Sequence, residues 1–251
     1  MLILKSGSLW QNNRWLLDQV DLEVRPGEAV LIWGLNGAGK SSLLDALSGW
    51  RSLDQGYVSI NNDLLSAWNP NLRAQHLSYL TQHHGVYFDG EVGELLGALI
   101  IKDKRINKAV LDSLSKTFGV GDLLDRRFMS LSGGEQAKVS LLRVMLQLSE
   151  NLENYRGRYL LLDEPLAHLD IFYQQAVYEN LTRLKQQGLG LVMVIHDLNQ
   201  AWRYADRFFI LLDGKLHECK TAEAVLEFFE LHYGMKLQMG KIEGRVFFIN
   251  S

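Results

Sequence analysis

Cysteine and long hydrophobic runs are scarce in this sequence. The first scarcity excludes an internal disulfide, and the second excludes a membrane-spanning segment. A single cysteine, Cys219, rules out a disulfide within the chain and fits a reducing compartment. The best apolar run, GLGLVMVI, falls well short of the ~20 residues needed to span a membrane. The apolar run in the initial stretch MLILKSGSLW is too short for the hydrophobic region of a signal peptide. We therefore expect a chain that is soluble by itself.

Linkers and an excess of one charge are also lacking. Only three prolines occur, and no Ser/Gly-rich segment, charge run or internal repeat divides the 251 residues, so we expect a single domain over 1–251. The net charge is −3, from 26 basic and 29 acidic residues, which does not favour nucleic acid as a partner. The apolar fraction of 47% is ample for a core.

What the sequence does contain is a glycine-rich loop, LIWGLNGAGKSSLL, after an apolar run. Gly34, Gly37 and Gly39 allow consecutive N–H groups to turn toward one centre, and the following KSSLLDALSGW is typical of a helix start. Lys40 adds a full positive charge, and the spacing places the Ser41 hydroxyl for Mg²⁺. The alternative is a glycine-rich turn that happens to precede Lys-Ser. The flanking strand and helix favour a phosphate-binding loop.

The pattern of apolar residues predicts an α/β fold. The first 35 residues alternate in polarity and predict antiparallel strands around a Pro26–Gly27 turn. Later, the short apolar runs YLLL, LVMVI and FFILL suit parallel strands covered on both faces by helices. The stretch from Glu91 to Gln147 lacks strand signals and predicts helices. We expect a core of residues 1–90 and 150–251 with a helical subdomain at about 91–149.

Two carboxylates follow the apolar run in RYLLLDEPLAHLD. In open α/β sheets such strand ends project into the ligand crevice, and adjacent residues point to opposite sides of a strand. We therefore assign Asp163 to Mg²⁺, through water, and Glu164 to the attacking water as general base. The alternative is a pair of solvated carboxylates that cap the next helix.

A second candidate phosphate site lies in SLSGGEQAKVSLL. Ser132 and Glu135 by themselves form a capping box, which signifies only the start of a helix. However, Gly133 and Gly134 beside a helix N-terminus can also hold phosphate. Because Gly34 to Ser41 already provides one phosphate site, this second one is available to a second chain.

Four motifs now stand in order along the chain: GLNGAGKS, LSGGE, LLLDEP and VIHDL. The sequence thereby resembles the ATP-binding subunit of an ABC transporter over nearly its whole length. This resemblance implies a P-loop NTPase with an N-terminal antiparallel β subdomain, a mostly parallel core sheet flanked by helices, and an inserted helical subdomain. It implies ATP and Mg²⁺ as cofactors and hydrolysis coupled to transport. In this family two copies bind head to tail, so residues 132–135 of one copy complete the site at Lys40 of the other.

Further residues take their roles from the same resemblance. Gln82 resembles the glutamine that contacts Mg²⁺ and water and senses the membrane partner, the alternative being a glutamine in an ordinary surface turn. His196 resembles the switch histidine that holds the γ-phosphate and the attacking water, and Asp170 resembles the aspartate at the subunit seam. Trp10 resembles the aromatic that stacks on adenine, with Trp15 as a rival and a core role open for either.

The motifs and the resemblance together imply three groups of site residues. The catalytic residues are Glu164, His196 and Gln82. The metal ligands are Ser41, Gln82 and Asp163. The nucleotide contacts are Trp10, Gly34, Leu35, Asn36, Gly37, Ala38, Gly39, Lys40, Ser41, Ser42, Ser132, Gly133, Gly134, Glu135 and Asp170.

The sequence departs from the family pattern at two pairs of residues. Ala137–Lys138 stand where glutamine and arginine are more usual, and Ala167–His168 replace a common serine–alanine pair. Neither pair performs the chemistry, so the departures concern contacts of the LSGGE helix and of the seam.

The resemblance extends to importers of cobalamin, haem and ferric siderophores. The connection LSENLENYRGRYLLLDEP and the tail with YGM and IEG are most similar to cobalamin importer ATPases, so cobalamin is the expected substrate and haem or a ferric siderophore the alternative. A soluble iron–sulfur assembly ATPase is less favoured. The implied partners are a second copy, two permease subunits and, indirectly, a periplasmic or extracellular binding protein, at the cytoplasmic face of the cell membrane. Residues 85–88 are expected to line the groove for the permease.

Overall fold

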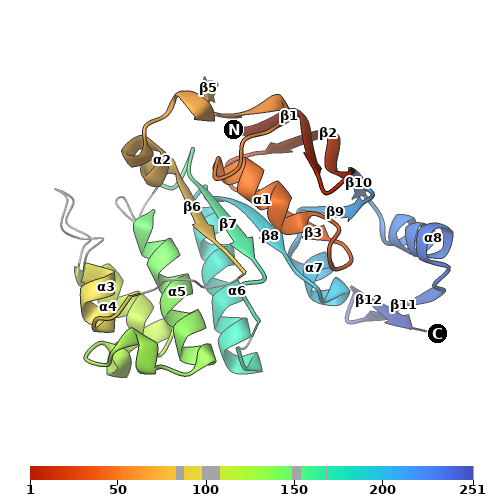
Figure 1. Ribbon diagram of the computed structural model, residues 1–251. Coiled ribbons are helices and arrows are strands. Elements are labelled where there is room, and N and C mark those ends of the chain that lie inside the picture. The colour runs from red at the N-terminus through yellow and green to blue at the C-terminus, as the bar shows by residue number, and fades with distance from the viewer. Residues whose placement is uncertain (83–87, 98–107, 149–153, 168, 251) are drawn as a thin grey trace.

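The computed structural model describes residues 1–82, 88–97, 108–148, 154–167 and 169–250 (Figure 1). Its strands form an antiparallel sheet, a mostly parallel sheet and a C-terminal hairpin. This arrangement confirms the predicted α/β class with an N-terminal antiparallel subdomain. None of the helices in these ranges is long and apolar enough to cross a membrane.

The antiparallel sheet has the order β2-β1-β4-β5. Its strands are β1 (Leu2–Gln11), β2 (Arg14–Val24), β4 (Gln55–Ile60) and β5 (Asp63–Leu64). β1 and β2 are joined by Asn12 and Asn13, with φ of 50° and 59°. Asparagine tolerates this left-handed backbone better than most residues, so the pair closes a tight hairpin.

The sequence prediction of a strand pair around Pro26–Gly27 is wrong. These residues join β2 to β3 (Ala29–Trp33), and the two strands belong to different sheets. The Gly27 N–H donates to the Gly188 carbonyl at 3.0 Å, so the turn is attached to the segment before β8. A Pro-Gly turn can reverse or redirect the chain, and here long-range contacts decide which occurs.

The core sheet has the order β10-β9-β3-β8-β7-β6, parallel except for the β9–β10 pair. Its remaining strands are β6 (Leu77–Leu80), β7 (Tyr159–Asp163), β8 (Gly190–Val194), β9 (Arg207–Leu212) and β10 (Lys215–Cys219). The apolar runs YLLL, LVMVI and FFILL therefore do form buried parallel strands.

Successive residues of the core strands pack into two different apolar clusters. Ala29 and Leu31 of β3 belong to the cluster on one face, whereas Val30 and Ile32 belong to the other. This alternation follows from the two-residue period of a strand. Both faces are covered, which explains why these strands are apolar throughout.

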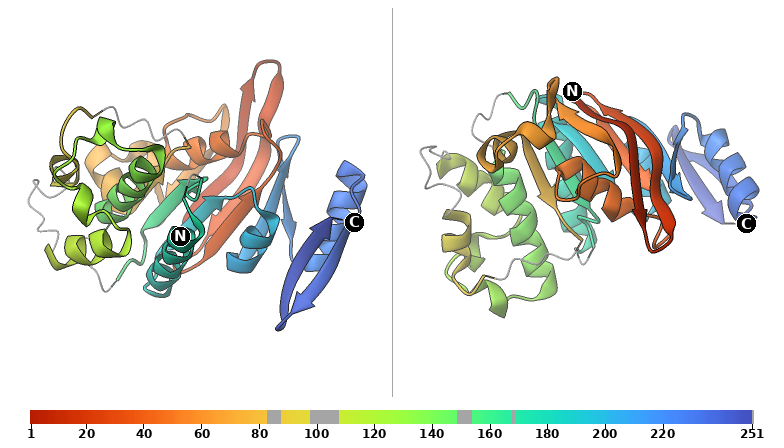
Figure 2. Two further views of the ribbon diagram at one scale, coloured as in Figure 1. Left: turned by 90° about the horizontal axis from the view of Figure 1, so that it is seen from below. Right: turned by 45° about the horizontal axis from the view of Figure 1, so that its top comes forward.

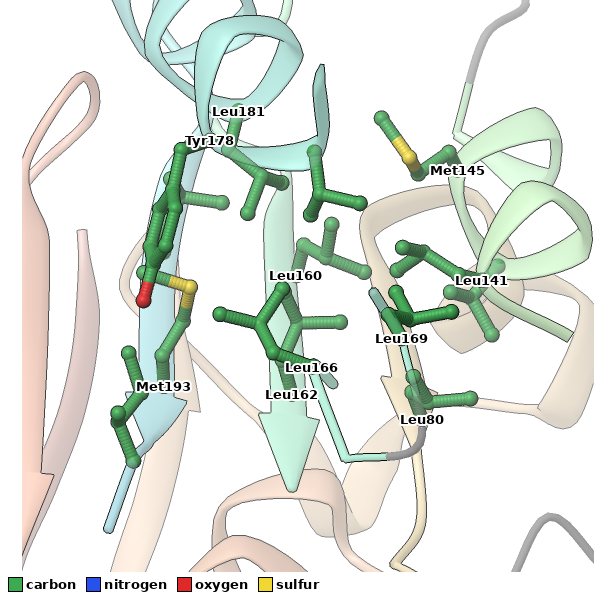
Figure 3. Packing of buried hydrophobic residues seen from close by; sticks show 14 of the residues in the cluster. Leu80, Leu141, Met145, Leu160, Leu162, Leu166, Leu169, Tyr178, Leu181 and Met193 are labelled. Carbon is green, nitrogen blue, oxygen red and sulfur yellow. The ribbon is translucent and has the colours of Figure 1, made fainter. Parts of the chain in front are cut away.

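Helices and the antiparallel sheet cover these two faces. α1 (Lys40–Ser48) lies between the antiparallel sheet and the core sheet (Figure 1). On the opposite face, α5 (Gly133–Gln147) contacts β6, and α5 and α6 (Ile171–Gln186) contribute Leu141 and Leu181 to the apolar cluster that contains Leu160 of β7 (Figure 3).

The helices between β6 and β7 gather at one end of the molecule (Figures 1 and 2). They are α3 (Val92–Gly97), α4 (Lys108–Thr117) and α5, with the short turns η2 (Gly121–Leu123) and η3 (Phe128–Ser130). α2 (Pro70–His76) precedes β6 and follows η1 (Leu65–Ala67). The inserted helices agree with the predicted fold class.

The C-terminal segment lies at the other end, in blue in Figure 2. It consists of α8 (Ala222–Tyr233) and the hairpin β11 (Leu237–Ile242) and β12 (Arg245–Asn250), and it contacts α7 (Leu198–Tyr204) through β12. Nearby, Cys219 is 5% exposed, and burial raises the pKa of its thiol to about 11.

Candidate nucleotide-binding and catalytic site

The phosphate-binding loop lies between the end of β3 and the start of α1. Gly37 and Gly39 have φ of 78° and 102°, a backbone that residues with a Cβ rarely adopt. At Gly39 a Cβ would also lie 2.8 Å from the Leu16 carbonyl oxygen. The glycines are therefore required by backbone shape and by the close approach of β2.

Lys40 is the charged centre of this loop. Its side chain is 6% exposed, and Nζ donates to the carbonyl oxygens of Gly34 at 2.8 Å and Leu35 at 3.0 Å. Burial lowers the pKa of the ammonium from its ordinary value, while Glu164 and then Asp163 oppose this. An incoming phosphate would supply the negative charge that this buried cation lacks.

Asp163, the last residue of β7, is suited to hold a cation. It is 1% exposed, and its Oδ1 has no hydrogen-bond partner among the described residues. Burial raises the pKa of its carboxyl, a hydrogen bond from Ser41 lowers it, and the charge of Glu164 raises it again. A buried carboxylate oxygen with spare acceptor capacity beside a serine hydroxyl suits Mg²⁺, which prefers oxygen ligands.

Glu164 meets two other predicted catalytic residues. Its Oε1 accepts from Gln82 Nε2 at 2.9 Å and lies 2.5 Å from His196 Nε2. Its backbone is left-handed, with φ of 51°, and its N–H donates to the Val194 carbonyl at 3.1 Å. The structure therefore brings the side chains of Gln82 and His196 to one carboxylate oxygen of Glu164.

The sheet order explains this convergence. Gln82 follows β6, Glu164 follows β7, His196 follows β8, and the phosphate loop follows β3, which are four neighbouring strands. Parallel strands end at the same edge of the sheet, so four segments far apart in the sequence meet there.

A cleft of about 470 Å³ opens at this edge. Its lining contains many of the predicted residues together with four that were not predicted. The full lining is Gln11, Asn12, Arg14, Leu16, Asn36, Gly37, Gly39, Lys40, Ser41, Ser42, Gln82, Glu164 and His196.

The β1–β2 hairpin supplies the unpredicted residues. Arg14 donates from Nη2 to the Gly37 carbonyl at 3.0 Å and so attaches the hairpin to the phosphate loop. The Asn-Asn pair at 12 and 13, between two alternating stretches, was a hairpin signal that could have placed Gln11 and Arg14 near a turn. Nothing local in the sequence points that turn at the phosphate loop.

Trp10 and Trp15, the two candidates for adenine stacking, face each other across this hairpin. They pair in register, with ring centroids 4.9 Å apart in an edge-on arrangement. Their exposed fractions are 46% and 40%, and neither belongs to the cleft lining. The adenine contact remains a prediction.

The LSGGE segment forms the expected capping box. The Ser132 N–H donates to Glu135 Oε2 at 2.8 Å, and the Glu135 N–H donates to Ser132 Oγ at 3.4 Å. Arg126 adds an ion pair to Glu135 at 2.9 Å. The pKa of Glu135 is lowered, first by the backbone N–H of Ser132. Residues 132–135 do not line the described cleft, so a nucleotide contact by them stays a prediction.

The segment after Glu164 leads into α6, and one of the residues that depart from the family pattern, Lys138, contacts this helix. Asp170 caps α6, accepting from the N–H groups of Phe172 and Tyr173, both at 3.1 Å. Lys138 of α5 places Nζ 3.0 Å from the centroid of the Tyr173 ring, so lysine at this position joins α5 to α6 by a cation–π contact. His168 lies outside the described residues, as do Gly85, Val86 and Tyr87, while Phe88 is half-buried against the core.

The site is that of a nucleotide-binding protein of the P-loop class, and comparison with known proteins specifies the family. Residues 17–167 match the family model described as ABC transporter. The chain is 40% identical to the hemin import ATP-binding protein HmuV of Photobacterium damsela subsp. piscicida, covering 84% of this chain and 80% of that one. It is 37% identical to the HmuV protein of Myxococcus xanthus, covering 92% and 89%.

Solved structures agree. An ATP-binding subunit of an ABC transporter superposes with a TM-score of 0.78 at 26% identity, over 92% of this chain and 94% of that one. A dimeric ATP-binding cassette in a post-hydrolysis state with ADP and Pi has the same fold, with a TM-score of 0.74 at 22% identity over 88% and 98%. The chain belongs to the ABC transporter family, as an ATPase subunit of the importer type.

Proposed function

We propose that this chain hydrolyses ATP through the cluster of Gln82, Glu164 and His196 beside the phosphate loop. The observation that carries the proposal is the meeting of both other side chains at Glu164 Oε1. Lys40 and the loop N–H groups would hold the β- and γ-phosphates. Asp163, Ser41 and Gln82 would hold Mg²⁺, which neutralises phosphate charge when bound.

The proton of the attacking water goes to Glu164. Its carboxylate accepts from the Gln82 amide, and its backbone is held by the hydrogen bond to Val194, so the proposed proton acceptor is held in place. Because Gln82 uses Nε2 for this contact, its amide oxygen is left for the cation. His196, 2.5 Å from Glu164, would orient the water and the γ-phosphate together.

A second copy would complete each site. The capping box at Ser132–Glu135 lies outside this chain's own cleft and exposes its helix N-terminus, which is suited to the phosphate of a nucleotide bound by a partner. The dimeric cassettes with this fold support the arrangement. The proposed assembly is two copies with two permease subunits at the cytoplasmic face of the membrane, served by a substrate-binding protein outside.

The proposed substrate is a metal-containing macrocycle of four pyrrole-derived rings, either haem or cobalamin. Haem is supported by the hemin import relatives at 34–40% identity. Cobalamin is supported by the resemblance of the tail with YGM and IEG. In this chain Gly234 caps α8 and Gly244 turns the β11–β12 hairpin, so both motifs are also required for the shape of the tail.

Uptake measurements would decide between them. The chain is purified from solubilised membranes with the permease that accompanies it, and the complex is reconstituted in vesicles with radiolabelled cobalamin or haem. ATP-dependent uptake of one ligand, abolished by Glu164→Gln, is the expected result. Recovery only with soluble scaffold proteins would contradict a transport role, and uptake of a ferric siderophore alone would contradict the substrate class.

A further inference from the structure

Two sets of contacts link the surroundings of His196 to the C-terminal end of the chain, one through Trp33 of β3 and one through α7. His196 follows β8 and precedes α7, and its side chain is 46% exposed. Burial therefore does not fix the ring. Apart from the contact with Glu164, its position depends on how firmly the backbone on either side is held.

On the β3 side, the backbone of His196 is held by a tryptophan. Trp33 Nε1–H donates to the His196 carbonyl at 2.8 Å. The indole is itself packed against α8, with ring centroids 4.8 Å from Phe229 and 5.9 Å from Tyr233. Residues of α8 thus determine where the indole N–H points.

On the α7 side, a side chain is paired with a strand. Asn199 Nδ2 donates to the Phe248 carbonyl at 3.1 Å, and the Phe248 N–H donates to Asn199 Oδ1 at 2.7 Å. The side-chain amide thus both donates to and accepts from the backbone of β12, as a neighbouring strand would. Asp197, next to His196, accepts from the Asn199 N–H at 2.8 Å. It thereby connects the Asn199–Phe248 pair to His196.

We infer that Trp33 and Asn199 are positioning residues for His196, and that the C-terminal segment 222–250 acts as a brace that fixes the histidine opposite Glu164. The inference rests on the proposed role of His196 in hydrolysis. A purely structural function of the segment would require apolar burial, which Phe229 and Phe248 supply. It would not require that Trp33, which packs on this segment, donate a hydrogen bond to the carbonyl of His196.

The test separates packing from positioning. Trp33→Phe keeps an aromatic ring against α8 and removes the N–H donor. In the complete transporter we expect kcat for ATP hydrolysis to fall about fivefold, the effect of one hydrogen bond, while the Kd for ATP changes by less than about twofold. Asn199→Ala should act in the same direction without touching Trp33.

A second readout does not depend on activity. In the chain labelled with ¹³C-histidine, the His196 Cε1–H resonance is assigned by its loss in His196→Ala. Trp33→Phe and Asn199→Ala should shift or broaden this resonance. The control is Trp68→Phe, because Trp68 is buried in the other apolar cluster and packs edge-on to His76. It should perturb His76 and leave His196 unchanged.

An unchanged His196 resonance in both variants would overturn the inference. So would a fall in kcat that is accompanied by an equal loss of ATP affinity and of thermal stability, since that pattern signifies general damage. A shifted resonance with an unchanged kcat would support the brace and contradict the proposed role of His196 in hydrolysis, so the two failures are distinguishable.

Discussion

The two candidate phosphate sites of this chain differ in how completely their polar groups are satisfied. At the first, Lys40 is buried and donates to two backbone carbonyls, and Asp163 keeps an oxygen that has no hydrogen-bond partner within the described part of the chain. At the second, Ser132 and Glu135 satisfy each other, and Arg126 neutralises the carboxylate. The first site contains charges that burial penalises, whereas the second is an ordinary helix start at the surface.

The comparison indicates a division of labour. The first site is assembled within one chain and is electrostatically prepared for a phosphate and a cation. The second requires that something approach its exposed amides. A dimer in which each copy brings its second site to the other's first site would use both.

The largest effect is expected at the proposed base. Glu164→Gln should lower kcat by about 10²- to 10⁴-fold, because proton transfer to the carboxylate is lost while the shape of the site is kept. ATP binding, measured by titration calorimetry, should persist. Glu179→Gln, at an exposed position of α6, is the control. Near-normal turnover of Glu164→Gln would remove Glu164 from its proposed role.

The buried cation should control affinity rather than turnover alone. Lys40→Ala removes the charge that faces the phosphates, and we expect the Kd for ATP to rise at least about 10- to 100-fold, the range of a charged hydrogen bond. Lys220→Ala, at an exposed position, should bind as wild type does. Unchanged binding by Lys40→Ala would contradict the assignment of the phosphate loop.

Mixed dimers would test the division directly. Lys40→Ala inactivates the first site and Ser132→Arg blocks the second, so each variant alone should be inactive. A mixture in equal amounts forms heterodimers in which one of the two shared sites is intact, and it should recover up to about a quarter of wild-type hydrolysis. Two sites each contained within one chain would give no recovery.

The smallest effect concerns stability. Since burial raises the pKa of Asp163, its ionised form opposes folding, and Asp163→Asn should raise the midpoint of thermal unfolding by about 2 °C at pH 7 while abolishing hydrolysis. The gain should shrink as the pH falls through the raised pKa, where wild type becomes neutral as well. Asp122→Asn, at an exposed site, is the control. A lower midpoint in Asp163→Asn would show that the carboxylate stabilises the fold.

Much of the core sheet could be predicted because its information is local. Strands buried on both faces have continuous apolar runs, and β7, β8 and β9 lie where YLLL, LVMVI and FFILL predict them. The phosphate loop is likewise encoded in its own glycines. The roles of Gln82, Glu164 and His196 were predicted through the family resemblance, and their convergence follows physically from the strand order.

Contacts between distant segments could not be predicted in this way. Arg14 reaches Gly37 only because the antiparallel sheet packs over α1, and no periodicity encodes that approach. The Pro26–Gly27 turn was misassigned because two antiparallel strands and a change of sheet have the same local pattern. The C-terminal hairpin was not predicted at all, although its alternation around Gly244 was visible.

The lone thiol of this chain is buried, which leaves the surface open to labelling at a chosen position. At neutral pH Cys219 is both protonated and inaccessible, so reagents that modify cysteines should leave the natural chain intact. A cysteine introduced at Phe172, which is 84% exposed beside the proposed seam, would then be the one reactive position in each copy. Spectroscopic probes attached there could follow how two copies approach and separate during a catalytic cycle, without first redesigning the protein.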